Sequence, residues 1–366
     1  MELSILKPYA GGFKRDRTVE NWSSLVWTER YSSNGDFELV SPDTSDIVDR
    51  LPVGGVFDPL CLVAIRESDV PMVVETHRLE QPKNGPPQII TSGRSFETVM
   101  DRRVTIRAIT SGVARVEWQI TAATPAIAAY EVMKSIIEDG DATALDIIPE
   151  IALLNSVVDS GVSVKYPVEP KDLYAWVIET LALGEYGLKS VLPIPSVDEI
   201  SVIIYKGTDR REEVVFDVAL DQFDESTYLL SKLGYKNAMI ISTTNGMEQA
   251  DTGVDPNTGL APTGLMRRVD FQDLSSEVTL PSGADLTTLS INKGKVALAD
   301  RLPTALFAGG IAASIADGFG SSYFLGDIVK LQGGYGLDQD ARIAEFVRTH
   351  DTTGIKSYPT FGAVTT

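Results

Sequence analysis

The hydrophobic pattern changes its period near residue 120, and this change limits the folds that the chain can adopt. Before that point apolar and polar residues alternate: in the segment DFELV, Phe37 and Leu39 alternate with Asp36 and Glu38. A period of two residues is that of a half-buried β-strand. The segments PLCLVAIRE, PMVVETHRLE, QIIT and VARVEWQIT continue the β character. We therefore expect a β module over residues 1–120.

Helical spacing replaces the alternation over residues 121–192. Thr124–Pro125 reads as an N-cap followed by proline at the first helical position, and Gly140 ends the apolar repeat. The segments from Pro149 to Gly161 and from Pro170 to Gly184 predict two further helices. These residues are expected to form a small helical insert domain.

Strand patterns return after residue 192. The segment EISVIIYKGTDRREEVVFDVAL predicts a hairpin that turns at Gly207–Asp209, and NAMIIST and MRRVDF predict strands. We assign residues 193–280 to a second β module and residues 281–320 to an Ala-rich, partly helical lateral segment. Residues 321–366 contain two strands joined by GGYG and are expected to complete the second module. The predicted fold class is α+β and mainly β.

The composition excludes several classes of protein. A net charge of −19 and a pI near 4.5 argue against a general nucleic-acid binder, because affinity for phosphate needs clustered Lys and Arg. Apolar runs stay below the ~20 residues that a membrane-spanning helix needs, and the N-terminus lacks a secretory signal. Cys61 is the single cysteine, which excludes an internal disulfide. We expect synthesis in a cytoplasm and no membrane insertion.

Residues able to perform catalysis at neutral pH are few. His77 lies in a strand pattern, and His350 lies beside Asp351 without a nucleophile motif. The common nucleotide, zinc and hydrolase motifs are absent from the sequence. The loop DTGVDPNTGLAPTG at residues 251–264 has the oxygen ligands of a calcium loop without its spacing, and a metal there stays an open question. We expect no catalytic residue and no cofactor.

The densest basic cluster is SGRSFETVMDRRV, whose arginines are Arg94, Arg102 and Arg103. An anion site is one interpretation. The interleaved acids Glu97 and Asp101 favour local ion pairs on a short helix instead. We therefore interpret the segment as a structural element, with the arginines facing acids of this chain or of a neighbouring subunit.

The same segment predicts its own packing. Ser95 is expected to cap the short helix. Phe96, Val99 and Met100 lie on one helical face and are expected to pack inward.

Several fragments occur in an order that resembles the baseplate hub family of long-tailed phages (siphophages), in the form common in actinobacterial phages. Members of this family are also called tail-tip hub or minor tail proteins. The fragments are WTERYSSNGDFELVSP, SGRSFETVMDRRV, YKGTDRREEVVFDVAL, YKNAMIIS, RRVDFQDLSS, YFLGDIVKL and YPTFG. They span most of the chain between Trp22 and Gly362, whereas residues 281–319 match poorly.

The resemblance implies a non-enzymatic virion structural protein with two β-barrel-like modules and lateral insert domains. It implies a homotrimer whose barrels form a ring that continues the tail tube at the tail tip. The implied partners are the distal tail protein, the C-terminus of the tape-measure protein and other minor tail or fibre proteins. DNA would pass through the channel on ejection without sequence-specific binding. Such a protein is synthesised in the cytoplasm of the bacterial host.

Six residues are candidates for the contact between subunits: Phe37, Leu39, Arg94, Arg102, Arg103 and Ile328.

Two other functions stay open from the sequence. Because Asp and Glu are abundant, a pair of carboxylates in a β-rich cleft could hydrolyse cell-wall glycan. A receptor-binding module, with loops such as residues 251–264 at an exposed tip, is the second alternative.

Overall fold

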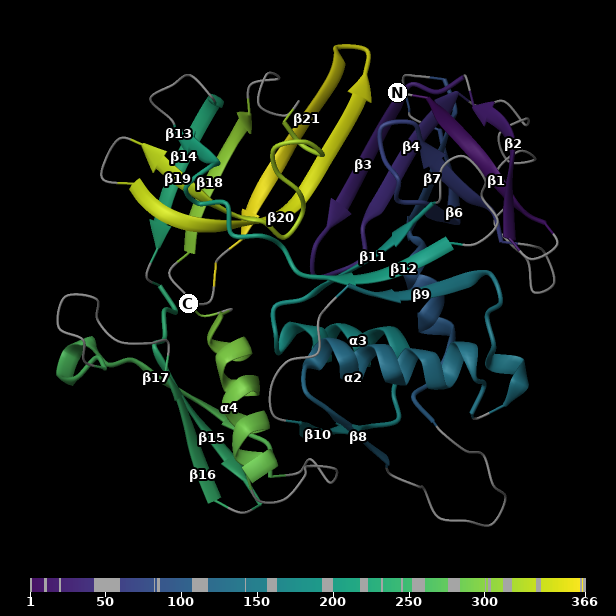
Figure 1. Cartoon of the computed structure of the whole chain (residues 1–366). Helices are drawn as coiled ribbons and strands as arrows, with labels where there is room; N and C mark the ends of the chain where they lie inside the picture. Colours follow the sequence, from purple (N-terminus) through teal and green to yellow (C-terminus); the bar gives the residue numbers. More distant parts are fainter. Residues whose placement is uncertain are drawn as a thin grey trace.

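The computed structural model confirms a mainly β fold with few helices (Figure 1). It describes residues 2–9, 12–19, 21–42, 60–81, 83, 86–106, 118–141, 143–156, 163–192, 200–217, 223–231, 233–244, 246–251, 261–275, 284–299, 301, 304–311, 318–333, 337–362 and 364.

Within these residues, one sheet of eleven strands forms the upper part of the molecule (Figure 1). Its N-terminal strands are β1 (Leu3–Tyr9), β2 (Gly12–Val19), β3 (Ser24–Arg30), β4 (Asp36–Pro42), β5 (Leu62–Ile65), β6 (Met72–Glu80) and β7 (Gln88–Ser95). Its C-terminal strands are β13 (Val215–Asp217), β19 (Ile328–Gly333), β20 (Leu337–Asp351) and β21 (Gly354–Gly362). The order is β13-β19-β20-β3-β4-β7-β6-β5-β1-β2, and β21 pairs with β20.

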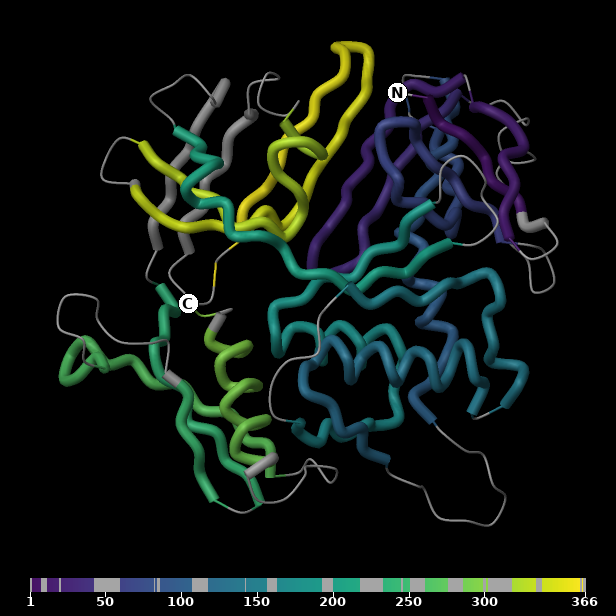
Figure 2. Tube along the Cα trace, viewed as in Figure 1, coloured from purple at the N-terminus to yellow at the C-terminus, as the bar shows by residue number. Residues whose placement is uncertain are grey.

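The two ends of the chain meet inside this sheet. Strand β20 pairs antiparallel with β3, from Glu345 opposite Arg30 to His350 opposite Leu25. Figure 2 shows the same arrangement, with the yellow C-terminal hairpin beside the purple N-terminal strands. The sheet covers two separate apolar cores. One is built around Trp27 and Phe37, and the other around Phe216 and Phe346.

The middle of the chain forms a layered insert below the sheet (Figure 1). Helices α2 (Pro125–Met133) and α3 (Leu173–Ala182) pack together between two small sheets. The insert strands are β8 (Trp118–Ala122), β9 (Ile151–Asn155), β10 (Val164–Val168), β11 (Gly187–Val191) and β12 (Ile200–Tyr205). Short helical turns are η1 (Phe96–Arg102), η2 (Lys134–Glu138) and η3 (Ala144–Asp146).

A further group, made of one small sheet and one helix, lies beside the insert (Figure 1). Strands β15 (Ala238–Thr243), β16 (Gly246–Asp251) and β17 (Val269–Asp273) form a sheet against which helix α4 (Ala284–Ala299) packs, and η5 (Gly264–Met266) precedes β17. Strands β14 (Phe223–Ser231) and β18 (Thr304–Ile311) pair with each other, and β18 contacts β21.

Two expected helices of the insert are confirmed. The Thr124 hydroxyl accepts a hydrogen bond from the Ile127 amide (3.2 Å), and Pro125 begins α2. Helix α3 begins shortly after Pro170 and ends before Gly184. The helix expected between Pro149 and Gly161 is wrong. Its first residues form β9, because Ile151 and Leu153 bury one strand face while the backbone pairs with β12.

The hairpin expected around Gly207–Asp209 is also wrong. Strand β12 pairs antiparallel with β11 and parallel with β9, whereas β13 pairs parallel with β19. The two strands therefore belong to different sheets, and the segment between them crosses from the insert to the large sheet. The Ala-rich segment contains α4 and β18, so it is partly helical, as expected. The domain boundaries stay a prediction.

Candidate assembly interface

Arg94 is neutralised within its own module. Its guanidinium donates to both carboxylate oxygens of Glu75 (each 2.8 Å) and to Asp101 Oδ2 (3.0 Å). The bidentate hydrogen bonds to Glu75 are the main cause that raises the pKa of Arg94. This arginine therefore joins β6, β7 and η1, and its charge is matched inside the chain.

The other two arginines of the cluster differ from each other. Arg103 Nε donates to the backbone carbonyl of Asp146 (2.9 Å) and lies 3.6 Å from its carboxylate, so it faces an acid of the same chain. Arg102 is exposed and forms an ion pair with none of the described residues. Arg102 therefore stays a candidate for a contact with another subunit.

Ser95 does not cap η1 with its side chain, so the expected cap is wrong. Its hydroxyl accepts a hydrogen bond from the Gly35 amide (2.8 Å) and donates to Glu97. Glu97 is only 3% exposed, and its second oxygen accepts from the Ser190 hydroxyl (2.6 Å) of β11. A buried carboxyl therefore connects the first β module to the insert, and burial raises its pKa.

The apolar side of η1 is confirmed. Phe96, Val99 and Met100 are buried in the large core that also contains α2 and α3. The segment SGRSFETVMDRRV is thus a strand followed by a short helical turn, and it fixes the insert to the first module.

Of the three apolar candidates for a subunit contact, two are buried inside the protomer and the third is half-buried. Phe37 and Leu39 are almost fully buried in the core of the first module, whereas Glu38 between them is exposed. Ile328 is half-buried, and β19 places it opposite Arg342 of β20. Their role in a subunit interface stays a prediction.

Tyr31 joins three parts of the chain, and no sequence pattern predicted this junction. Its hydroxyl donates to the Glu185 carbonyl (2.8 Å) and accepts from the Gly207 amide (3.2 Å). Its ring is approached so closely by Gly187 and Gly326 that a Cβ would lie 2.4 Å and 2.2 Å from ring atoms. Because these contacts join residues far apart in sequence, no local pattern marks them.

Arg342 adds charge to the same junction. Its guanidinium donates to the Gly326 carbonyl (2.9 Å) and to the Glu185 carboxylate (2.6 Å). It also lies over the Tyr31 ring, 5.3 Å from the ring centre. The first module, the insert and the closing strands are therefore held together at one buried point.

Each end of the large sheet has a strand with one partner among the strands described. Strand β2 pairs with β1, and β13 pairs with β19. The β1–β2 hairpin could have been predicted from the sequence, because two strand-like segments flank the Gly11–Gly12 pair. Unpaired strand edges are sites where another chain can add.

The described residues contain no group of three or more His, Cys, Asp or Glu side chains that could hold a metal ion. His77 is half-buried on a strand face and lies 2.8 Å from the Thr91 hydroxyl. His350 packs edge-on against Trp22 at 4.6 Å. Residues 252–260 of the suspected calcium loop lie outside the described residues.

Among the helices that the structure describes, none is long and apolar enough to span a membrane.

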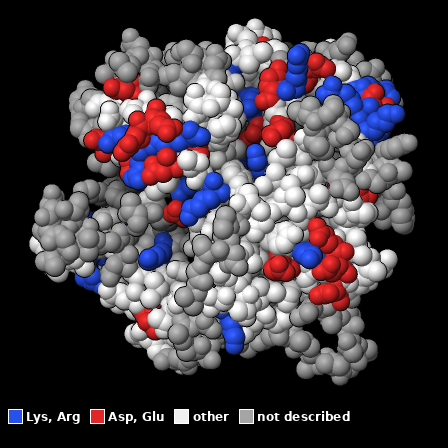
Figure 3. Space-filling view, viewed as in Figure 1, with Lys and Arg blue, Asp and Glu red and all other residues white. Residues whose placement is uncertain are grey.

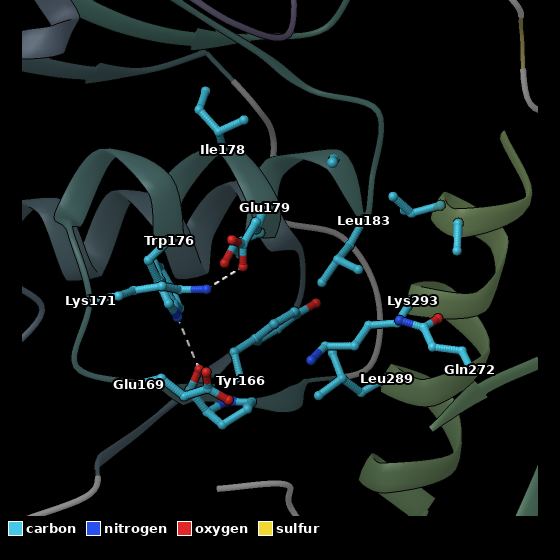
Figure 4. Close-up of a pocket in the computed structure, with 15 residues that line it drawn as sticks. Tyr166, Glu169, Lys171, Trp176, Ile178, Glu179, Leu183, Gln272, Leu289 and Lys293 are labelled. Atoms are coloured by element: carbon cyan, nitrogen blue, oxygen red, sulfur yellow. Dashed lines mark hydrogen bonds and ion pairs between the residues drawn. The ribbon is translucent and has the colours of Figure 1, made fainter. Parts of the chain in front are cut away.

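A pocket of about 430 Å³ lies between α3, β10 and α4 (Figure 4). Tyr166 and Lys293 point into it from opposite sides, and Trp176 donates its indole hydrogen to the Pro167 carbonyl (3.1 Å). Glu179 forms an ion pair with Lys171 at the rim.

Comparison with solved structures places this fold among phage tail proteins. The 43 kDa tail protein of prophage MuSo2 from Shewanella oneidensis has a TM-score of 0.59 at 13% identity, covering 99% of this chain and 98% of that chain. The tail protein from Neisseria meningitidis MC58 has a TM-score of 0.59 at 13% identity, covering 99% and 97%. Prophage tail protein gp18 from Listeria monocytogenes EGD-e has a TM-score of 0.52 at 11% identity, covering 100% and 95%.

The sequence itself defines the family. The model of the Siphovirus ReqiPepy6 Gp37-like protein family matches residues 6–363, so the chain belongs to that family. No curated protein matches it. The chain therefore belongs to a siphovirus family and shares its fold with phage tail proteins.

Proposed function

We propose that this chain is a structural hub of the siphophage tail tip, in which three copies form a ring that continues the tail tube. The observation that carries the proposal is the large sheet, which joins both ends of the chain and has a strand edge at each end. Edges of this kind are covered when copies close into a ring. Phage tail proteins share the fold over nearly the whole chain.

The proposed partners follow from this position in the virion. The ring contacts the distal tail protein on one side and other minor tail or fibre proteins around it, and the C-terminus of the tape-measure protein reaches its channel. DNA passes through on ejection. A net charge of −19 suits a channel that must not bind DNA tightly. The protein is made in the cytoplasm of the bacterial host before it joins the tail.

We propose a non-enzymatic role. The polar groups near η1 and Tyr31 are engaged in contacts between modules, as expected for a scaffold. Hydrolysis of cell-wall glycan by the purified chain, abolished by replacing one carboxylate, would overturn this part of the proposal.

Electron microscopy of the purified chain and of isolated tails tests the proposal. We expect particles with threefold symmetry and a central channel, and the same ring at the end of the tail tube. A chain that remains monomeric at high concentration and occupies a tail position off the tube axis would contradict it.

A further inference from the structure

Strand β2 makes one end of the large sheet basic, although the chain as a whole is acidic. Four consecutive residues of β2, from Lys14 to Arg17, are exposed. Figure 3 shows the resulting group of blue side chains at the upper right, where Figure 1 places β2. The cations of β1 and β2 are Lys7, Lys14, Arg15 and Arg17, and Asp16 is the acid among them, which leaves a local charge of +3.

The pairing within this group leaves one cation open. Asp16 accepts from both Lys7 (3.2 Å) and Arg17 (2.9 Å), so one carboxylate serves two cations. Arg15 is exposed and pairs with no acid in the described part of the chain. The register of β1 and β2 also shifts between Ile5 and Leu6, which interrupts the regular ladder beside this edge.

The opposite end of the sheet, at β13, is acidic. Its cations are Arg210, Arg211 and Lys330. Its acids are Asp209, Glu212, Glu213, Asp217, Asp327, Asp338 and Asp340, which gives a local charge of −4. Figure 3 shows these mixed charges at the upper left, and Figure 1 places β2 and β13 at opposite ends of the upper row.

The cations of this end are already engaged by its own acids. Arg210 pairs with Asp327 (2.8 Å), Arg211 with Asp340 (2.6 Å) and Lys330 with Asp338 (2.9 Å). Glu212 is exposed and pairs with no cation among the residues that the structure describes. The acidic end therefore has an open negative charge, as the basic end has an open positive charge at Arg15.

These charges discriminate between the two kinds of contact that copies of one chain can make. Two β2 edges repel each other, and so do two β13 ends, which disfavours twofold contacts of either edge with itself. The basic β2 edge of one copy and the acidic β13 end of another attract each other. Because this contact uses two different surfaces, each copy can make it with the next.

We propose that the β2 edge of one copy docks against the β13 end of the next copy, so that the subunits associate head to tail. This inference rests on the proposed ring and names the surfaces that close it. Nucleic acid is the competing ligand for a basic strand. The local charge of this edge is only +3, and two of its four cations share Asp16, so it can make few phosphate contacts. We therefore favour a second copy as the partner.

Charge reversal in the full-length chain tests the contact. R15E/R17E changes the local charge of the β2 edge from +3 to −1, and E212K/E213K changes that of the β13 end from −4 to 0. Each is expected to weaken self-association at least about tenfold, measured by analytical ultracentrifugation, because the attraction between the two surfaces is then removed. The chain with all four changes should associate more strongly than either double variant, because the reversed positions on the two surfaces again have opposite charges.

A matched control reverses two exposed lysines on the lower half of the molecule, K165E/K295E. It changes the net charge as much as R15E/R17E does and should leave association unchanged. Thermal unfolding of each variant verifies that it is folded.

The outcomes separate this inference from the proposed ring. If the unchanged chain forms a ring but neither reversal weakens it, or the four-change chain does not recover, the β2–β13 contact is wrong and the ring stands. A chain that never associates overturns the ring itself. If R15E/R17E loses binding to double-stranded DNA and keeps its self-association, the basic edge is a nucleic-acid site instead.

Discussion

At the scale of single residues, Glu97 shows how a polar group can be part of a core. Its carboxyl lies between η1 and β11, with hydroxyls of Ser95 and Ser190 on its two oxygens. A buried carboxyl without partners would cost several kcal/mol, and the two hydroxyls offset part of that cost. Burial still dominates, and the pKa of Glu97 lies above its ordinary value of 4.5.

The raised pKa predicts a pH dependence of stability. Above about pH 4.5 the unfolded chain loses the Glu97 proton while the folded chain keeps it, so this residue lowers the free energy of unfolding as pH rises toward the folded pKa. Glu97→Gln has no such proton. The free energy of unfolding of the variant minus that of the unchanged protein should therefore rise with pH, in urea unfolding between about pH 4 and 8.

Glu38→Gln is the control, because Glu38 is exposed on β4. Its difference from the unchanged protein should stay flat over the same range. A flat difference for Glu97→Gln as well would contradict the role of burial.

At the scale of secondary-structure elements, a buried ion pair supports the pairing of β20 with β3. The Arg348 and Glu29 side chains are 8% and 6% exposed and bond to each other, and the guanidinium lies 4.6 Å from the centre of the Phe346 ring. Both charges have been removed from water, so neither can lose its partner without a large cost.

Arg348→Met should therefore lower the free energy of unfolding by about 3–5 kcal/mol, because Glu29 stays buried without a partner. The double variant R348M/E29L should recover most of this loss, since it leaves no buried charge. Equilibrium denaturation measures both. Arg78→Met, which removes the exposed pair with Glu80 (3.0 Å), is the control and should cost less than about 1 kcal/mol. A double variant as unstable as R348M would show that apolar packing, and not charge, sets the cost.

At the scale of the whole molecule, the shared sheet couples the N-terminal and C-terminal parts of the chain. Strand β20 belongs to both, because it pairs with β3 as well as with β19 and β21. The Tyr31 junction adds the insert to the same unit.

Native-state hydrogen exchange should therefore report the same opening free energy for the amides of Val26 and Thr28 in β3 as for that of Val347 in β20. The amides of β15 and β17 should exchange with a lower opening free energy, because that sheet packs mainly on α4. Exchange of β20 at a much lower free energy than β3 would show that the modules open independently.

The sequence by itself determined the local elements and the family. Alternation in DFELV predicted a half-buried strand, Thr124–Pro125 predicted the start of α2, and the order of fragments along the chain indicated a siphophage tail protein. These features depend on neighbours within a few residues, or on resemblance, and both are present in the chain before it folds.

Only the tertiary structure decided which elements pair and which charges meet. The apolar run of β9 fits a helix or a strand, and its parallel partner β12 settled the choice. Ser95 could have capped a helix, but Gly35 and Glu97 occupy its hydroxyl. The Tyr31 junction depends on contacts between residues that are 154 and 176 positions apart. The strand order of the large sheet places the charged groups at β2 and β13 at its opposite ends. Such contacts leave no periodic pattern in a single sequence, because packing and not spacing creates them.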